Sequence, residues 1–220
     1  MSAAETTNLA QKLAEYGLDV PEDRIALLDR FRTALWRWNE QLNLTRHTTL
    51  DKFVGRDVVD SLQLAQLLRS GERVLDVGTG GGVPGLVLAI CRPDLRVNVC
   101  ESTQKKARVA QAIVQELALP VQVYACRAEE VLELQTFDTL TVRGVAALAK
   151  ILAWFQPYWE AFDRLLLVKG QRWVDERGEA RHMGLLKSLE LRKAATYLTR
   201  ETGAESVILS IRRENSGDSE

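Results

Sequence analysis

The chain has 220 residues, of which 46% are hydrophobic, and this is enough for one main domain with a sizeable core. Its formal net charge of -1 gives no global electrostatic reason to bind nucleic acid, so any basic surface has to be local. The three cysteines lack paired or metal-type spacing, and two histidines are too few for a metal cluster. Since no secretory signal or membrane-length apolar run occurs, we expect a soluble cytoplasmic protein without metal or membrane contact.

The first seventy residues are predicted to be helical. Residues 5–16 form a short helical pattern, and from Pro21 to Leu42 apolar residues recur at helical spacing. A third helical stretch spans residues 50–68, and Gly71 then marks the entry to a different pattern.

Two tryptophans in the second predicted helix allow two interpretations. Trp36 and Trp38 lie among basic residues, and aromatic side chains interleaved with positive charge could stack on nucleic-acid bases. The stronger interpretation is that they pack this helix against the rest of the protein.

A glycine-rich loop begins the second part of the chain. The apolar run from Arg73 to Val77 is typical of a buried strand, and the pattern of a helix starts at Val83 after four glycines. Strand, glycine turn and helix together predict the entry to a nucleotide-binding α/β sheet. Glu101 follows the next predicted strand, where a carboxylate would hold ribose hydroxyls.

The spacing of the loop limits which nucleotide it can hold. A dinucleotide fingerprint would need a third glycine at position 83, which is Val83, and a P-loop would need a lysine that is absent. The loop Asp76-Val77-Gly78-Thr79-Gly80-Gly81-Gly82 instead looks like that of S-adenosylmethionine (AdoMet) methyltransferases.

Alternating patterns after residue 71 predict a doubly wound sheet. Helical patterns at 102–118, 145–159 and 174–189 separate most of the strands, which predicts parallel pairing. The last two strands have only a turn between them and must form a hairpin. The predicted strands are 73–77, 96–100, 121–124, 138–142, 164–168, 191–198 and 206–211.

This pattern defines the expected fold class and organisation. We expect an α/β protein with the Rossmann-like class I methyltransferase fold, whose mostly parallel seven-stranded sheet ends in an antiparallel hairpin. Residues 1–70 are expected to form an N-terminal helical cap region and residues 71–213 the AdoMet-binding core. Residues 214–220 are polar and are expected to be a disordered tail of one compact unit.

Ligands of such sheets bind outside the carboxyl ends of the strands. Glu129 could accept the adenine amino group or be a solvated carboxylate at a helix start. Arg143 and Lys169 end two strands as cations, which could contact the AdoMet carboxylate or RNA phosphate. The alternative for both cations is a salt bridge to Asp76 or Glu101.

Missing motifs narrow the chemistry. Strand 138–142 is followed by Arg143-Gly144 and not by the Asn/Asp-Pro-Pro-Tyr motif of exocyclic-amine methylation. No cysteine follows this strand or the next, so covalent attack on a pyrimidine has no nucleophile. A ring nitrogen such as guanine N7 needs neither group, and the enzyme would mainly align the reactants.

Several motifs together resemble the bacterial 16S ribosomal RNA guanine-N7 methyltransferases of the RsmG (GidB) family, from about Asn39 to Arg213. They are Asn43-Leu44-Thr45, Phe53-x-x-Arg56 with Asp60-Ser61-Leu62, the loop from Leu75 to Gly85, Ser102-x-x-Lys105-Lys106, Arg127-x-Glu129-Glu130 and Leu167-Val168-Lys169-Gly170.

The resemblance implies methylation of one guanine in the decoding-region loop of 16S rRNA, with AdoMet as cofactor. The substrate would be 16S rRNA, the 30S subunit or its precursor, and we expect a monomer. The candidate cofactor-binding residues are Gly78, Gly80, Gly82, Val83, Glu101, Ser102, Thr103, Ala128, Glu129 and Arg143. The candidate catalytic residues are Asn43, Arg143 and Lys169, and the candidate RNA-binding residues are Arg56, Lys105, Lys106, Arg127 and Lys169.

Basic residues on or near the predicted cleft rim indicate a local basic surface around the cofactor. They are Arg46, Arg56, Lys105, Lys106, Arg108, Arg127, Arg143, Lys169 and Arg172. One departure from the family pattern is Asp57, which stands where a histidine is usual.

Other functions remain open at this point. A methyltransferase of the same fold could act on a small molecule or protein. A nicotinamide dehydrogenase is disfavoured by Val83 and the terminal hairpin, and a non-catalytic RNA-binding protein by the intact glycine loop with Glu101.

Overall fold

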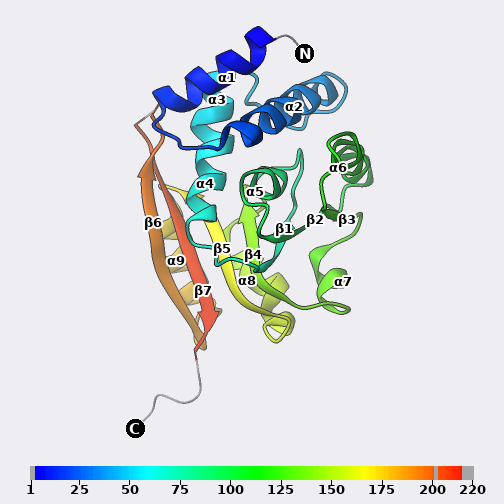
Figure 1. Ribbon diagram of the computed structural model, residues 1–220. Helices are drawn as coiled ribbons and strands as arrows, with labels where there is room; N and C mark the ends of the chain where they lie inside the picture. Colours follow the sequence, from blue (N-terminus) through cyan, green and yellow to red (C-terminus); the bar gives the residue numbers. More distant parts are fainter. Residues whose placement is uncertain (1–2, 201–202, 215–220) are drawn as a thin grey trace.

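The computed structural model describes residues 3–200 and 203–214, and these contain a seven-stranded mixed sheet (Figure 1). The predicted disordered tail lies almost wholly outside the described residues. The strands are β1 (Arg73–Val77), β2 (Arg96–Cys100), β3 (Gln122–Tyr124), β4 (Phe137–Arg143), β5 (Phe162–Gly170), β6 (Leu189–Leu198) and β7 (Glu205–Arg213).

The strand order is β3-β2-β1-β4-β5-β7-β6, which confirms the predicted class. The first five strands pair in parallel, whereas β7 runs antiparallel to both β5 and β6. The chain leaves β1 toward β2 on one side and later returns to β4 on the other. A crevice is expected at such a switch point, beyond the carboxyl ends of the strands.

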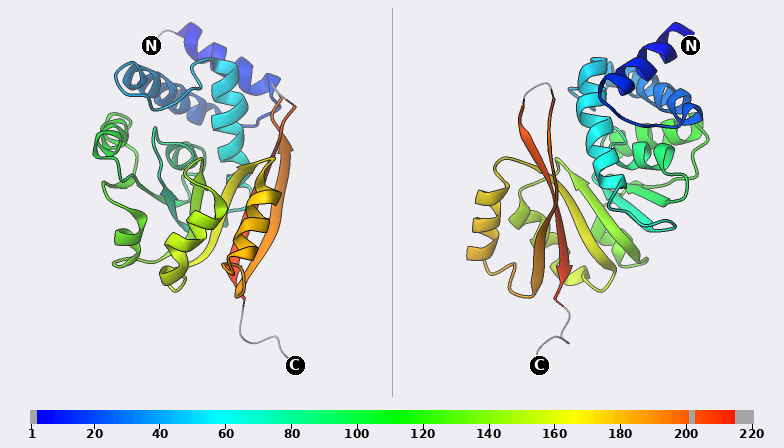
Figure 2. Two further views of the ribbon diagram at one scale, coloured as in Figure 1. Left: turned by 180° about the vertical axis from the view of Figure 1, so that it is seen from behind. Right: turned by 60° about the vertical axis from the view of Figure 1, so that its left-hand side comes forward.

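Helices cover both faces of the sheet (Figure 1). They are α1 (Ala3–Glu15), α2 (Glu22–Asn39), α3 (Leu50–Lys52), α4 (Val59–Ala65), α5 (Gly85–Cys91), α6 (Gln104–Glu116), α7 (Ala128–Leu132), α8 (Leu148–Phe155) and α9 (Trp173–His182). The right-hand view of Figure 2 shows the N-terminal helices and α9 on opposite sides of the sheet.

Two cores lie on the two faces, because alternate residues of each strand point to opposite sides. Val74 and Val99 pack with α4, α5, α6 and the N-terminal helices, whereas Leu75 and Leu167 pack with α7, α8 and α9. Across the described residues, no helix has the length and apolarity that a membrane span requires.

The helix predicted over residues 50–68 contains an irregular turn. Between α3 and α4 the chain forms a π-helical segment, η1 (Phe53–Val58), and α4 ends at Ala65. Gly55 lies under Tyr16, and a Cβ there would meet the Tyr16 hydroxyl at 2.9 Å. This close approach brings η1 against the residue that follows α1.

Two other predicted helices are too long. The helix predicted over 145–159 is α8 followed by a 3₁₀ turn, η2 (Gln156–Tyr158), that contains Pro157. The helix predicted over 174–189 ends at His182, because Gly184 adopts a positive φ of 75° that stops it. Hydrophobic periodicity continued through both stretches and did not reveal these ends.

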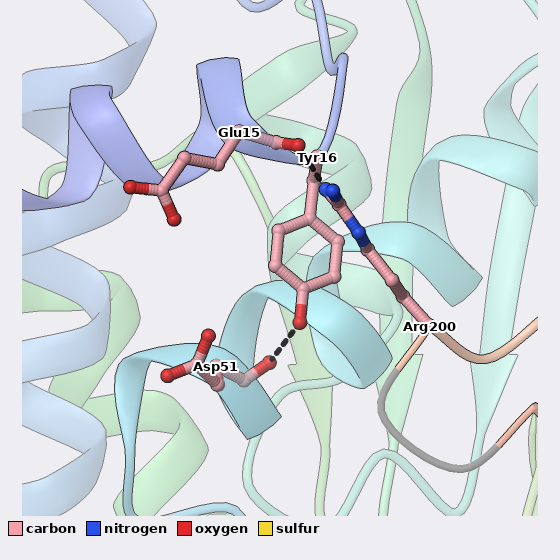
Figure 3. Close-up of a pocket in the computed structure, with 4 residues that line it drawn as sticks. All are labelled: Glu15, Tyr16, Asp51 and Arg200. Carbon is pink, nitrogen blue, oxygen red and sulfur yellow. Dashed lines mark hydrogen bonds between the residues drawn. The ribbon is translucent and has the colours of Figure 1, made fainter.

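Arg200, which follows β6, lies against the end of α1 (Figure 3). The guanidinium of Arg200 stacks over the Tyr16 ring at 5.3 Å and donates a hydrogen bond to the carbonyl of Glu15. The Tyr16 hydroxyl donates to the Asp51 carbonyl at 3.4 Å. The last described elements of the chain thus contact the first.

Candidate active site

A cavity of about 740 Å³ opens at the carboxyl ends of the parallel strands. The loops after β1, β2, β4 and β5 form it together with η1 and the connection between α2 and α3. The predicted site residues that line it are Arg56, Gly78, Gly80, Val83, Glu101, Ser102, Thr103, Lys106, Arg143 and Lys169.

The first two glycines of the loop after β1 adopt backbone conformations that favour glycine, and Gly80 also faces open space. Gly78 and Gly80 have positive φ angles of 66° and 56°, which side chains other than glycine rarely adopt. A Cβ on Gly80 would meet no neighbouring atom closer than 3.9 Å. The backbone at Gly80 is therefore accessible for close approach by a ligand.

The later glycines of the same loop serve packing. A Cβ on Gly81 would meet Leu35 at 2.7 Å, and one on Gly82 would meet Leu86 at the same distance. Gly82, a predicted cofactor contact, is not among the cavity-lining residues. Its contact instead ties the loop to its own helix and to Phe31 of α2.

Glu101 joins two backbone segments at the cavity. Its Oε2 accepts a hydrogen bond from the Gly80 amide at 3.0 Å, and its Oε1 accepts one from the Thr103 amide at 2.7 Å. Each carboxylate oxygen can accept a further bond. The carboxylate is thus fixed beside the glycine loop with capacity left for a ligand hydroxyl.

Arg143, at the end of β4, forms ion pairs with two buried carboxylates. Its guanidinium lies 2.5 Å from Asp57 Oδ1 and 3.0 Å from Asp60 Oδ2. Burial alone would lower the pKa of Arg143, but the two carboxylates raise it above its ordinary value. The sequence left open a salt bridge from Arg143 to Asp76 or Glu101. Arg143 does form salt bridges, but its partners are Asp57 and Asp60.

Lys169, at the end of β5, is similarly paired. Its Nζ lies 2.7 Å from Glu176 Oε2 and donates at 2.7 Å to the Ala146 carbonyl. The Glu176 carboxylate also accepts from the Leu148 amide at the start of α8. Both strand-end cations therefore reach the cavity with their charge compensated.

Arg56 connects η1 to the hairpin. Its guanidinium donates to Thr199 Oγ1 at 2.6 Å and to Ser206 Oγ at 3.1 Å, and lies 3.6 Å from Asp60. Tyr197 of β6 donates to Asp60 Oδ1 at 2.7 Å. Asp60 is thus held by three side chains from three parts of the chain.

His47 enters the cavity from the α2–α3 connection. Its Nδ1 lies 2.8 Å from Asp57 Oδ1, the same oxygen that Arg143 contacts. In the sequence, His47 counted only as one of two histidines that are too few for a metal cluster, and Asp57 only as a departure from the family pattern. The only sequence signal was that Asp57 stands where a histidine is usual. That substitution does not indicate that Asp57 contacts His47 in the folded protein.

Asp76 lies at the centre of the sheet edge and is fully buried. Its Oδ2 accepts from the Gly85 amide at 2.9 Å and its Oδ1 from the Thr141 hydroxyl at 3.0 Å. Loss of hydration on burial is the largest influence and raises the pKa of Asp76 to about 6, despite these hydrogen bonds. Asp76 therefore joins β1 to the start of α5, where the glycine loop ends, and to the neighbouring strand β4.

Several predicted residues lie outside the cavity lining. Glu129 pairs with Arg127 at 2.7 Å, and Arg127 stacks over Trp154. The predicted site residues that do not line the cavity are Asn43, Gly82, Lys105, Arg127, Ala128 and Glu129. Of the expected basic surface, Arg46, Arg56, Lys106, Arg143 and Lys169 line it, among the carboxylates of Asp57, Asp60 and Glu101.

The family model for rRNA small subunit methyltransferase G matches residues 24–201. The chain belongs to this family. It is 55% identical over 185 residues to ribosomal RNA small subunit methyltransferase G of Rhodopirellula baltica, covering 84% of this chain and 80% of that protein. It is 40% identical to the Sorangium cellulosum protein of the same name, covering 78% of this chain and 74% of that one.

Solved structures support the fold of this family member. An O-methyltransferase from Bacillus cereus superposes with a TM-score of 0.58 at 14% identity, covering 83% of this chain and 90% of that one. The TrmK protein of M. capricolum superposes with a TM-score of 0.56 at 14% identity, covering 71% and 68%. The chain therefore has the Rossmann-like fold of AdoMet-dependent methyltransferases.

Proposed function

We propose that this protein transfers the methyl group of AdoMet to N7 of a guanine in the 16S rRNA of the small ribosomal subunit. Membership of the rRNA small subunit methyltransferase G family is the observation that carries the proposal. The cavity at the carboxyl edge of the sheet supplies a site of suitable size and chemistry.

The lining residues from the loops after β1 and β2 fit AdoMet. The backbone at Gly80 is open to close approach by a ligand. The Glu101 carboxylate lies 3.0 Å from the Gly80 amide, and there it can accept hydrogen bonds from ribose hydroxyls. Ser102 and Thr103, which follow Glu101, also line the cavity. When bound, AdoMet supplies an electrophilic methyl group on a sulfonium.

Other side chains of the lining can position a nucleotide. They are Arg46, His47, Arg56, Arg143 and Lys169. Arginine and lysine side chains contact RNA phosphates, and in this role they fix orientation without reading sequence. We infer that Arg143 lies between the cofactor and the RNA, and that Lys169 and Arg56 support it.

Direct attack by a ring nitrogen suits these residues. Cys100 is buried, burial raises its pKa above the ordinary value, and none of the three cysteines is among the cavity-lining residues. A covalent cysteine route is therefore not supported. Guanine N7 carries a free lone pair, and alignment of the reacting atoms alone can lower a barrier by roughly 7–11 kcal/mol.

The test is methyl transfer from radiolabelled AdoMet to naked 16S rRNA and to small subunits, both from cells that lack the enzyme. The expected product is 7-methylguanosine at a single position, identified by nucleoside mass spectrometry and mapped by primer extension. We also propose that the enzyme is a monomer in the cytoplasm. Comparing the rates on the two substrates decides whether it acts on free RNA or on the assembled particle. A methylated small molecule or protein, with no label in rRNA, would contradict the proposal.

A further inference from the structure

The cavity lining around Arg143 is rich in hydrogen-bond donors. Arg143 is committed to Asp57 and Asp60, Lys169 to Glu176, and both aspartates are buried. The ring of His47 faces the same cavity and is 27% exposed. Its uncommitted nitrogen is therefore a group that a base could contact.

The backbone of His47 is held on both sides. Its amide donates to Thr45 Oγ1 at 2.9 Å, and its carbonyl accepts from the Trp36 indole at 2.9 Å. This role for Trp36 agrees with the packing interpretation of that residue rather than base stacking. The imidazole is consequently presented from a fixed point of the α2–α3 connection.

Asp57 determines which ring nitrogen carries the hydrogen. Its side chain is only 1% exposed, and its Oδ1 forms an ion pair with the Arg143 guanidinium at 2.5 Å. An ionised carboxylate only accepts hydrogen bonds, so Nδ1 of His47 must be the donor. In the neutral ring Nε2 is then an acceptor, and within residues 3–200 and 203–214 it has no hydrogen-bond partner.

Guanine needs an acceptor of this kind. Its N1–H and its exocyclic amino group are donors on the edge opposite N7, whereas adenine has a bare acceptor nitrogen at N1. A guanine whose N7 meets the cofactor turns this edge away from it, toward other parts of the cavity lining, and that lining includes His47. A donor left unpaired in a desolvated site costs binding energy, so an acceptor there selects for guanine.

We propose that His47 is a specificity-determining residue, whose Nε2 accepts a hydrogen bond from the Watson–Crick edge of the target guanine. Asp57 is a positioning residue that fixes the tautomer and orientation of the ring. This inference rests on the proposed function and extends it by naming the group that distinguishes guanine from adenine, whose N7 is also a nucleophile.

The experiment compares single-turnover methylation of two 16S transcripts, one with guanosine and one with adenosine at the mapped position. His47→Ala should lower the rate on the guanosine transcript by about 10- to 100-fold and leave the adenosine rate within about twofold. His47→Gln places an amide oxygen near the position of Nε2 and should restore much of the guanosine preference. His47→Asn lacks that reach and should resemble the alanine variant.

Asp57→Asn tests the positioning role. It should lower the ratio of guanosine to adenosine rates, and the double variant with His47→Ala should lower it no further, because both changes remove one interaction. Arg46→Ala is the matched control on the same connection. Removal of a phosphate-binding side chain should slow both transcripts equally and leave the ratio unchanged.

AdoMet affinity by calorimetry and a thermal unfolding midpoint accompany each variant. If His47→Ala lowers the methylation rates of both transcripts equally and His47→Gln does not restore the guanosine preference, the assignment of His47 is overturned. The proposed function then still stands, provided that the wild-type enzyme methylates the guanosine transcript. A wild-type enzyme inactive on the guanosine transcript and on small subunits would overturn both.

Discussion

At the scale of single residues, Glu101 joins the glycine loop after β1 to the segment after β2. Its carboxylate already accepts the amides of Gly80 and Thr103 and has further acceptor capacity. Glu101→Ala removes the acceptor and leaves these donors unpaired, so AdoMet binding should weaken by about 1–3 kcal/mol. Isothermal calorimetry measures the affinity for AdoMet. An unchanged affinity in a folded variant would mean that Glu101 does not bind the cofactor.

Asp76 makes the stability of the fold depend on pH. Its folded pKa of about 6 exceeds the ordinary 3.8, so the native state binds more protons than the unfolded state between these values. The stabilisation from Asp76 is therefore full below about pH 4 and is lost as the pH rises through about 6.

Asp76→Asn should remove this dependence, because an amide can still accept from Gly85 and donate to Thr141. The variant should have a free energy of unfolding at pH 7.5 that is higher by up to about 3 kcal/mol. Urea unfolding at pH 5 and pH 7.5 measures both proteins. The same loss of stability between these pH values in the variant would contradict the account.

At the scale of elements, α6 carries two lysines near the cavity, of which Lys106 lines it and Lys105 is exposed beside it. Replacing both by alanine should weaken RNA binding and reduce the slope of log affinity against log salt by about 0.7–0.9 for each phosphate interaction that is removed. AdoMet binding should remain unchanged.

The matched control for this pair is Lys187→Ala with Lys193→Ala, two exposed lysines outside the cavity lining. It changes the net charge equally, so a general electrostatic effect would appear in both double variants. Fluorescence anisotropy over a salt series measures the slopes. Equal slopes for the α6 variant and the wild-type protein would mean that these lysines make no RNA contact.

Sequence patterns predicted elements to different degrees. The strands were predicted well because their apolar runs are bounded by glycine and charged residues, as for β1 and β2, whose bounds agree fully. The η1 turn was not predicted, since a π-helical segment continues the same apolar periodicity. The end of α9 depends on the backbone conformation of Gly184, which sequence spacing does not record.

Part of the candidate site was also predicted from the sequence, and part was not. Gly78, Glu101, Arg143 and Lys169 were predicted because the carboxyl ends of parallel strands meet at one edge. The pairing of His47 with Asp57 was missed because it crosses an irregular connection that has no periodic signal.

At the scale of the whole molecule, the predicted cap region and core share one interior. Leu28, Phe31 and Phe53 pack in the same cluster as Leu86 and Val87 of α5. The glycine loop contacts α2 directly, and the hairpin contacts both η1 and α1. We infer that the N-terminal helices complete the fold and are not an attachment to it.

A fragment of residues 71–220 should therefore fail to fold alone. It would expose the apolar face of α5 that α2 and α4 cover, and burial of each large apolar side chain contributes about 1.5–3 kcal/mol. Circular dichroism during heating should show no cooperative transition for the fragment, in contrast to the full chain. A cooperative transition in the fragment would make residues 1–70 a separable cap.

The central claim is that methyl transfer occurs in the cavity at the carboxyl edge of the sheet, and Arg143 tests it most directly. The measurement is the single-turnover rate of 7-methylguanosine formation in 16S rRNA by Arg143→Ala, with Arg172→Ala as a control outside the cavity lining. Unfolding midpoints establish that each variant is folded, because Asp57 and Asp60 lose their counter-ion in Arg143→Ala. We predict a loss of about 100-fold or more for Arg143→Ala, equivalent to about 3 kcal/mol of transition-state stabilisation, and little change for the control. A folded Arg143→Ala enzyme with the wild-type rate would contradict the placement of the active site.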